Sequence, residues 1–113
     1  MQFLDARLHG ILDYLAALAL IIAPFVLGLD QFGPVAMWLS VAGGGGLILY
    51  SLLTDYTFGA ASIIPYRVHL TLDLAAAIAF IAAIFIFGFT GLAAIYYTVM
   101  AVGVILVVLV SKR

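Results

Sequence analysis

The sequence predicts an all-α integral membrane protein whose four transmembrane helices form two tandem, parallel-related helical hairpins. The first observation is the composition: 68% of the 113 residues are hydrophobic, only 8% are charged, and the mean hydropathy is +1.38. A soluble domain carries about 25% charged residues, so lipid is the expected solvent. Since one span needs about 20 residues, the length provides about four spans in a single membrane domain and no separate soluble domain.

The second observation is an internal repeat. An Arg-x-His-x-x-x-Asp pattern at 7–13 returns sixty residues later at 67–73. From residue 7 to residue 28, about half of the positions are identical to the position sixty residues further on. A composition rich in Ala, Leu and Ile does not align Arg, His and Asp together by chance. We therefore divide the domain into repeat 1, residues 7–53, and repeat 2, residues 67–113.

Repeat 1 is expected to hold helices at about residues 9–27 and 35–53. Between them, the stretch Gly28–Pro34 contains two glycines, two polar residues and a proline, which are typical of a turn followed by a helix start. The stretch from Gln31 to Thr54 contains no charged residue. The two helices therefore form a tight hairpin.

Repeat 2 follows a polar segment, Thr54–Tyr66, which we expect to be a loop at the membrane surface. From Leu74 to Ser111 the sequence is free of charge for about 38 residues, nearly twice the length of one span. Two glycines at Phe87–Gly91 mark the break. The predicted helices are at about 68–87 and 93–110.

The basic residues predict the orientation in the membrane. All of them fall at the N-terminus, in the central loop or at the C-terminus, and the two hairpin turns hold none; they are Arg7, Arg67, Lys112 and Arg113. By the positive-inside rule, both termini and the central loop face the cytoplasm. Because both repeats then share one topology, a pseudo-two-fold axis along the membrane normal should relate them.

A family resemblance follows from these motifs. Ala23–Gly28 reads Ala-Pro-Phe-Val-Leu-Gly, and its counterpart Ala83–Gly88 reads Ala-Ile-Phe-Ile-Phe-Gly. Together with His-x-x-x-Asp at each helix start, this resembles the SPW-repeat family of small prokaryotic membrane proteins, named for a Ser-Pro-Trp in each repeat. The resemblance implies a multi-pass protein of the inner, cytoplasmic membrane and no established biochemical function. The motif keeps only its proline in repeat 1 and nothing in repeat 2, so it assigns no site residues.

The two His/Asp pairs are the candidate functional residues. Residues i and i+4 share one helix face, so His9 lies over Asp13 and His69 over Asp73. A carboxylate inside the membrane costs several kcal/mol unless it is paired or protonated, so both should point into the bundle. We expect Asp13 to reach His69 or Arg67, and Asp73 to reach His9 or Arg7. The predicted intramembrane polar network is Arg7, His9, Asp13, Arg67, His69 and Asp73.

Several roles suit this network. The interpretation we favour is structural, in which the pairs join the repeats and satisfy one another. Proton or ion handling is a second hypothesis, because ionisable groups in membranes mark pathways and His titrates near neutral pH. Axial ligation of haem or a chlorin by His9 and His69 is a third. A metal site of two His and two Asp is a fourth, since one-turn spacing also suits metal ligands.

A run of four glycines in the second predicted helix indicates close helix packing, because small residues allow backbones to approach in a membrane. Only Gly43 has a glycine counterpart sixty residues later. The fourth helix should therefore face lipid, while the second lies centrally or against a partner. The predicted helix-packing residues are Gly43, Gly44, Gly45, Gly46 and Gly103.

Aromatic residues are expected to form belts at the two membrane interfaces. The outer belt would hold Phe32, Trp38, Tyr96 and Tyr97, and the inner belt Tyr14, Tyr50, Tyr56 and Tyr66.

The sequence carries no nucleophile motif and no phosphate-binding loop, and it contains neither Cys nor Glu, so we do not expect an enzyme. A net charge of −1 without a basic run gives no reason to expect a nucleic-acid partner. The predicted function is that of a structural or accessory subunit in the lipid bilayer, as a homo-oligomer or on a larger membrane complex, with no cofactor. The alternatives are a small proton- or ion-coupled transporter or channel acting as an oligomer, and a haem- or pigment-binding subunit using His9 and His69.

Overall fold

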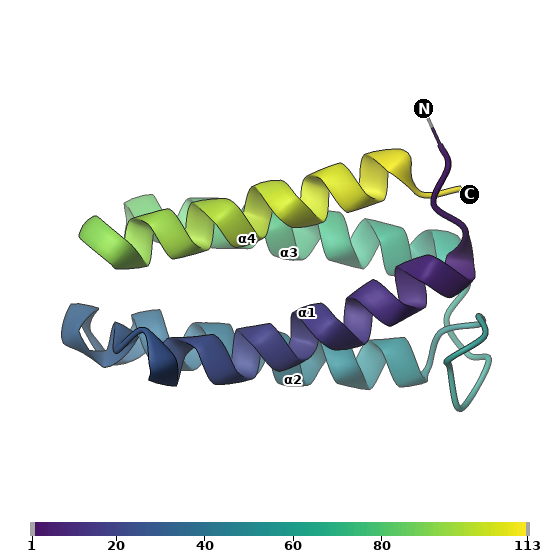
Figure 1. Ribbon diagram of the computed structural model, residues 1–113, viewed down its shortest axis with the longest axis horizontal. Helices are drawn as coiled ribbons and strands as arrows, with labels where there is room; N and C mark the ends of the chain where they lie inside the picture. Colours follow the sequence, from purple (N-terminus) through teal and green to yellow (C-terminus); the bar gives the residue numbers. More distant parts are fainter. Residues whose placement is uncertain (1, 113) are drawn as a thin grey trace.

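The computed structural model describes residues 2–112, so the predicted basic residue Arg113 lies outside the described residues. Within this range the chain forms α1 (Ala6–Val26), the 3-10 helix η1 (Leu29–Phe32), α2 (Pro34–Leu52), α3 (Tyr66–Ile86) and α4 (Gly91–Val110) (Figure 1). Each α-helix is long and apolar enough to span a membrane. The predicted all-α membrane fold is therefore confirmed, and each helix begins slightly earlier than the sequence indicated.

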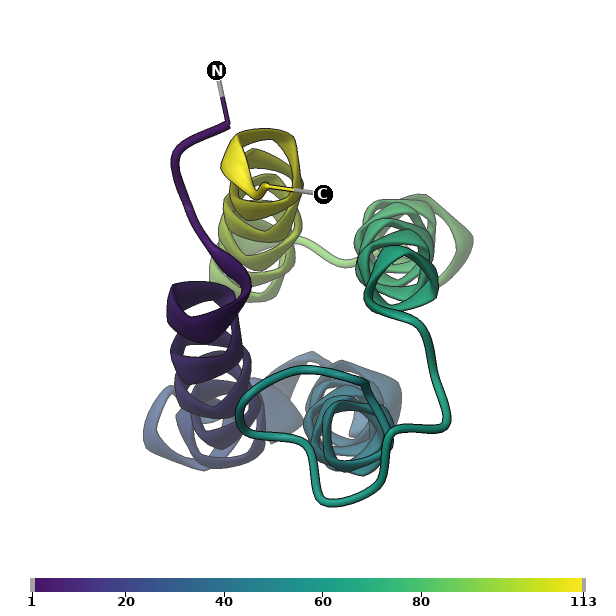
Figure 2. The ribbon, with the colours of Figure 1, turned by 90° about the vertical axis from the view of Figure 1, so that its right-hand side faces the viewer.

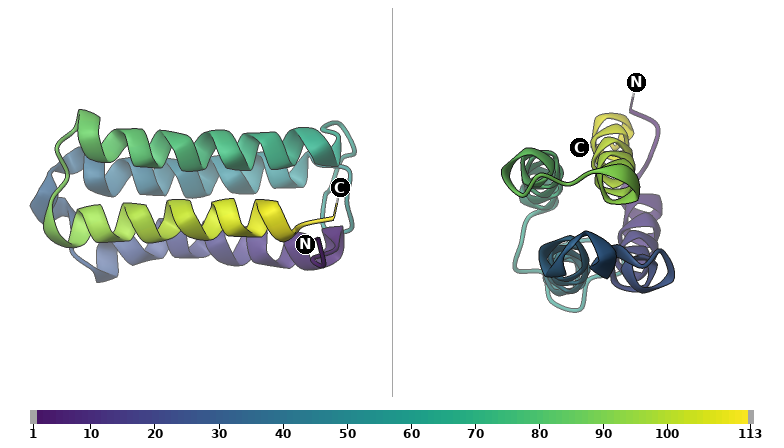
Figure 3. Two further views of the ribbon diagram at one scale, coloured as in Figure 1. Left: turned by 90° about the horizontal axis from the view of Figure 1, so that it is seen from above. Right: turned by 90° about the vertical axis from the view of Figure 1, so that its left-hand side faces the viewer.

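The α-helices stand at the corners of a square in the order α1, α2, α3, α4, so that α1 lies diagonally opposite α3 (Figure 2). Each hairpin packs closely within itself, α1 against α2 and α3 against α4. The chain termini and the central loop share one end of the bundle, and the two hairpin turns share the other (Figure 3). The first turns of α1 and α3, which carry the His/Asp pairs, therefore lie at the same end.

Both hairpin turns begin with the same helix ending. Leu27 caps α1 and Phe87 caps α3, and the next residue in each case is a glycine, Gly28 or Gly88, with φ of 65°. This left-handed conformation is the common way to end a helix, and glycine adopts it without the strain that a Cβ atom would add. The repeat in sequence is thus also a repeat in backbone geometry.

The glycines of α2 occupy three different environments. A Cβ atom added at Gly44 would lie 2.7 Å from the carbonyl oxygen of Ala17, so the close approach of α1 and α2 depends on this glycine. A Cβ atom at Gly43 would lie 3.1 Å from the ring of Phe80 in α3. At Gly45 and Gly46, as at Gly103 in α4, an added Cβ atom would meet nothing within 4 Å.

The surface of the bundle is more apolar than parts of its interior. Large hydrophobic side chains face outward on all the α-helices, among them Ile22, Leu49, Phe85 and Ile95. In water the hydrophobic effect would favour burying such residues, whereas in lipid it does not, because the lipid tails are equally apolar. The arrangement is that of a protein solvated by a bilayer.

Two tyrosines expected in the outer aromatic belt lie inside the bundle instead. The hydroxyl groups of Tyr96 and Ser40 are 2.6 Å apart, and the hydroxyl of Tyr97 donates to the carbonyl of Ala36 at 2.6 Å. Both rings are buried, and both bridge the diagonal from α4 to α2. The belt prediction is wrong for this pair because α2 offers interior acceptors that replace the lipid headgroups.

Candidate functional site

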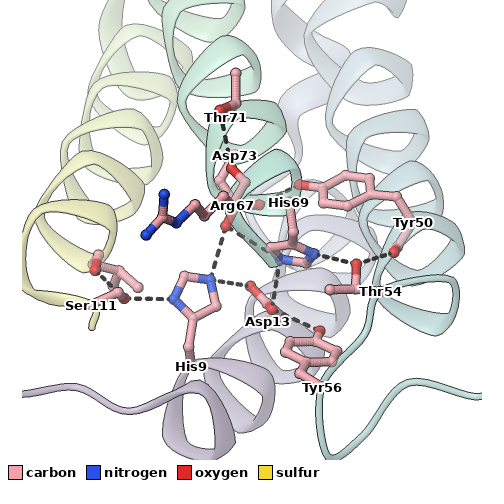
Figure 4. Close-up of polar contacts among 11 residues, drawn as sticks. His9, Asp13, Tyr50, Thr54, Tyr56, Arg67, His69, Thr71, Asp73 and Ser111 are labelled. Carbon is pink, nitrogen blue, oxygen red and sulfur yellow. Dashed lines mark hydrogen bonds and ion pairs between the residues drawn. The ribbon is translucent and has the colours of Figure 1, made fainter. Parts of the chain in front are cut away.

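The two His/Asp pairs meet at the centre of the bundle, at the end that holds the termini (Figure 4). His9 and Asp13 come from α1, and His69 and Asp73 come from α3. Because the members of each pair are four residues apart, they lie on the same face of their helix, and this face points into the bundle. Both histidines are fully buried, and the two aspartates are at most 5% exposed. We call these four residues the His/Asp ring.

In the His/Asp ring, each imidazole contacts both carboxylates. His9 Nε2 lies 2.9 Å from Asp73 and 3.1 Å from Asp13. His69 Nε2 lies 2.8 Å from Asp13 and 3.4 Å from Asp73. The contacts between repeats are the shorter ones for both histidines. The ring therefore joins repeat 1 to repeat 2, across the diagonal of the bundle.

Hydroxyl groups fix the proton on the far nitrogen of each imidazole. Ser111 Oγ lies 2.7 Å from His9 Nδ1, and Thr54 Oγ1 lies 2.8 Å from His69 Nδ1. Each hydroxyl donates its own proton to a backbone carbonyl one turn earlier, at 2.6 Å. A hydroxyl has one proton to donate, so it must accept from Nδ1–H. Both histidines therefore carry a proton on Nδ1 and present Nε2 to the carboxylates.

Tyrosines hold the carboxylates from outside the ring. The hydroxyl of Tyr50 in α2 donates to Asp73 Oδ1, and the hydroxyl of Tyr56 in the central loop donates to Asp13 Oδ2 at 2.8 Å. Burial, together with the nearby Asp13 charge, raises the pKa of the Tyr56 phenol, so it remains a donor at neutral pH. Every member of the ring thus has an orienting partner outside it.

Short backbone pairings hold the two hydroxyl residues in place. Leu4 pairs with Ser111, and Ile64 pairs with Thr54, each as an isolated parallel bridge. Leu4 and Ile64 are sixty residues apart, so they are equivalent in the two repeats. In both cases the segment before the first helix of one repeat pairs with the end of the other repeat, at the hydroxyl residue that orients a histidine.

Sequence comparison of the repeats missed Thr54 for a definite reason. The residue aligned with Ser111 at the fixed spacing is Ser51, one turn earlier in α2. In the structure Thr54 contacts the histidine, because α2 ends at Leu52 and the chain folds back into the bridge with Ile64. A search for any hydroxyl residue near each helix end would have found the pair.

The structure places Arg7 and Arg67 outside this site, which corrects the predicted network. Both residues are exposed, and within residues 2–112 no ion pair joins either guanidinium to Asp13 or Asp73. The physical reason is the helix register. Each arginine lies two residues before a histidine, on a different face of the helix, where it can reach the headgroup region.

A cavity of about 630 Å³ extends from the His/Asp ring along the inside of the bundle. Asp13, Asp73 and Tyr50 line one end of it, and the rest of the lining is apolar or glycine, including Gly46 and Gly103. The glycines leave this space because they have no side chain to fill it. The two carboxylates therefore border a space whose other walls are apolar.

The ring does not fit bis-His ligation of haem or a chlorin. The macrocycle would have to lie between Nε2 of His9 and Nε2 of His69, with the metal bonded to both. Two carboxylates already stand there, within 3.4 Å of these nitrogen atoms. The space between the histidines thus suits a small ion or protons rather than a planar cofactor.

Fold and site together define a multi-pass membrane protein made of a duplicated helical hairpin, with a buried His/Asp ring at the junction of its repeats. The sequence profile of the SPW repeat domain matches residues 7–111, and the chain therefore belongs to this family. No curated protein sequence and no solved structure matches the chain.

Proposed function

We propose that this protein is a non-enzymatic structural subunit of the prokaryotic inner membrane, and that the His/Asp ring fastens its repeats into one bundle. The observation that carries the proposal is the closed pattern of contacts in the ring. Each imidazole contacts a carboxylate of the other repeat at 2.9 Å or less. Polar contacts that join the two repeats in this way favour one arrangement of the two hairpins.

The membrane makes such a ring more important than it would be in water. Between helices in lipid there is no hydrophobic driving force, so packing and interhelical polar contacts decide how the helices associate. The close packing in this bundle lies within each hairpin. Contacts between α1 and α3 through the ring, together with the hydrogen bonds of Tyr96 and Tyr97 to α2, therefore specify how the hairpins dock.

The partner we propose is a second copy of this chain. On α2, Ala42 and Gly45 are exposed and lie outside the lining of the cavity, and an added Cβ atom at Gly45 meets no atom within 4 Å. Ala42 and Gly45 lie three residues apart on one face of α2, and small residues on a helix face let two membrane helices approach closely. A surface of small residues makes closer van der Waals contacts with another helix than with lipid tails, so helix association is favoured here.

Self-association can be tested by native mass spectrometry of the full chain released from its membrane in mild detergent. We expect a homo-oligomer that Gly45→Leu converts to monomer, because the leucine obstructs the helix contact. The matched control is Ala79→Leu, which places the same side chain at an exposed position of α3 outside the lining of the cavity. A monomeric wild-type protein, or equal assembly of both variants, would contradict this partner.

Ion transport is a second candidate, because Asp13 and Asp73 line the cavity as well as the ring. Substitution Asp73→Asn distinguishes the two functions. The structural proposal expects the bundle to lose stability. Transport instead requires ion flux in proteoliposomes that disappears in the variant while the bundle and its assembly persist.

A further inference from the structure

We infer that the His/Asp ring binds one divalent first-row transition-metal ion, with Nε2 of His9 and His69 and one carboxylate oxygen each from Asp13 and Asp73 as ligands. The inference goes beyond the structural function proposed above and does not depend on self-association.

The spacing of the ligand atoms fits one ion. One ligand atom from each of the four residues lies within 4.8 Å of all the others. The four nitrogen–oxygen contacts, made by both oxygens of Asp13 and by Oδ2 of Asp73, span 2.8 to 3.4 Å. Metal bonds of 2.0–2.2 Å in a tetrahedral site place the ligand atoms about 3.3–3.6 Å apart, so the ring must widen by a few tenths of an ångström to surround an ion.

The hydrogen-bonded layer outside the ring prepares the imidazoles for a metal. A ligating histidine normally donates its other N–H to a fixed acceptor, which sets the tautomer and the ring orientation. Ser111 and Thr54 supply such acceptors for His9 and His69. With the proton held on Nδ1, a neutral imidazole directs the lone pair of Nε2 toward the carboxylates.

His69 Nε2 is the observation that points to a ligand. It is fully buried, and within the described residues it makes no hydrogen bond. Asp13 Oδ2 lies only 2.8 Å away, but off the direction in which a proton on Nε2 would point. A buried polar atom without a hydrogen bond is costly. A metal ion between the four residues would engage this nitrogen, which a proton on it does not achieve.

The net charge of the ring also favours a divalent cation. Two carboxylates carry −2, and two neutral imidazoles add nothing, so one divalent cation makes the site neutral. Nitrogen and oxygen donors with no thiolate suit zinc, iron(II) or cobalt(II) rather than soft copper(I). With four protein ligands the site is closed, as in structural zinc sites.

Zinc uptake tests the inference. The full chain in detergent is stripped with a chelator, dialysed against Zn²⁺ alone, and analysed for bound metal. We expect one Zn²⁺ per chain in the wild type, and binding at least about 10-fold weaker in His69→Gln and Asp73→Asn. Thr54→Val, which removes only the outer acceptor, should weaken binding by about 10- to 100-fold. Tyr96→Phe, at the other end of the bundle, is the matched control and should bind as the wild type does.

A readout on the wild type alone guards against variants that fail to fold. X-ray absorption of the zinc-loaded protein should show nitrogen and oxygen ligands with the outer-shell scattering of two imidazoles. Less than half an ion per chain, equal uptake by wild type and His69→Gln, or a spectrum without imidazole would overturn the inference. A wild type that binds no zinc, but still needs Asp73 for stability, would overturn the metal site and leave the structural function intact.

Discussion

At the scale of single residues, the site depends on where four protons lie. The hydroxyls of Thr54 and Ser111 donate to backbone carbonyls, and this leaves them as acceptors for Nδ1–H of the two histidines. The orientation of each imidazole is thereby set from outside the His/Asp ring. The hydroxyl residues are positioning residues, although nothing in the repeat pattern singled out Thr54.

Removing the Thr54 hydroxyl should therefore destabilise the bundle. Thr54→Val keeps the shape of the side chain but leaves His69 Nδ1–H buried without an acceptor, which costs about 1–3 kcal/mol. The free energy of unfolding in detergent measures this loss. Thr54→Ser restores the acceptor and should stay within about 0.5 kcal/mol of the wild type. Equal stability of the valine and serine variants would show that the hydroxyl does not hold the histidine.

At the scale of the helices, sequence and structure agree where local rules decide the outcome. Apolar length predicted the spans, and glycines 28 and 88 predicted where α1 and α3 end. The cost of an unpaired carboxylate in lipid also predicted that the acids turn inward. Sequence alone could not give the burial of Tyr96 and Tyr97, since their acceptors lie on α2, about sixty residues earlier in the chain. Long-range pairing decides such positions.

The glycine run of α2 offers a test at this scale. Gly44→Ala brings a methyl group to 2.7 Å from the Ala17 carbonyl, so α1 and α2 must separate, at a cost of about 1–3 kcal/mol. Gly45→Ala meets no atom within 4 Å and should leave the fold within about 1 kcal/mol of the wild type, on the stabilising side. Thermal unfolding of the two variants in the same detergent makes the comparison. Similar unfolding temperatures would contradict the close approach at Gly44.

At the scale of the whole molecule, polar groups gather inside and apolar groups face the lipid. The termini and the central loop lie at the end that holds the His/Asp ring. The described basic residues Arg7, Arg67 and Lys112 also lie at this end, and we propose that it faces the cytoplasm. The ring then lies in the cytoplasmic part of the membrane, one or two helical turns from the surface.

The absence of cysteine from the sequence makes this orientation simple to test. Single cysteines at Ser62, in the central loop, and at Gln31, in a hairpin turn, provide matched positions at the two ends of the bundle. In intact cells, a thiol reagent that does not cross membranes should label Gln31→Cys and spare Ser62→Cys. The reverse labelling would place the termini outside.

The central claim is that the ring joins the two repeats, and a double-mutant cycle between His9 and Asp73 tests it most directly. We would measure the free energy of unfolding for the wild type, His9→Gln, Asp73→Asn and the double variant. Each single change should cost about 3–5 kcal/mol, because it leaves a buried partner unpaired. The double variant should cost less than the sum of the two by at least about 1 kcal/mol, whereas the exposed Arg67→Gln combined with Asp73→Asn should be additive. Additive losses for His9 and Asp73, within about 0.5 kcal/mol, would contradict the account.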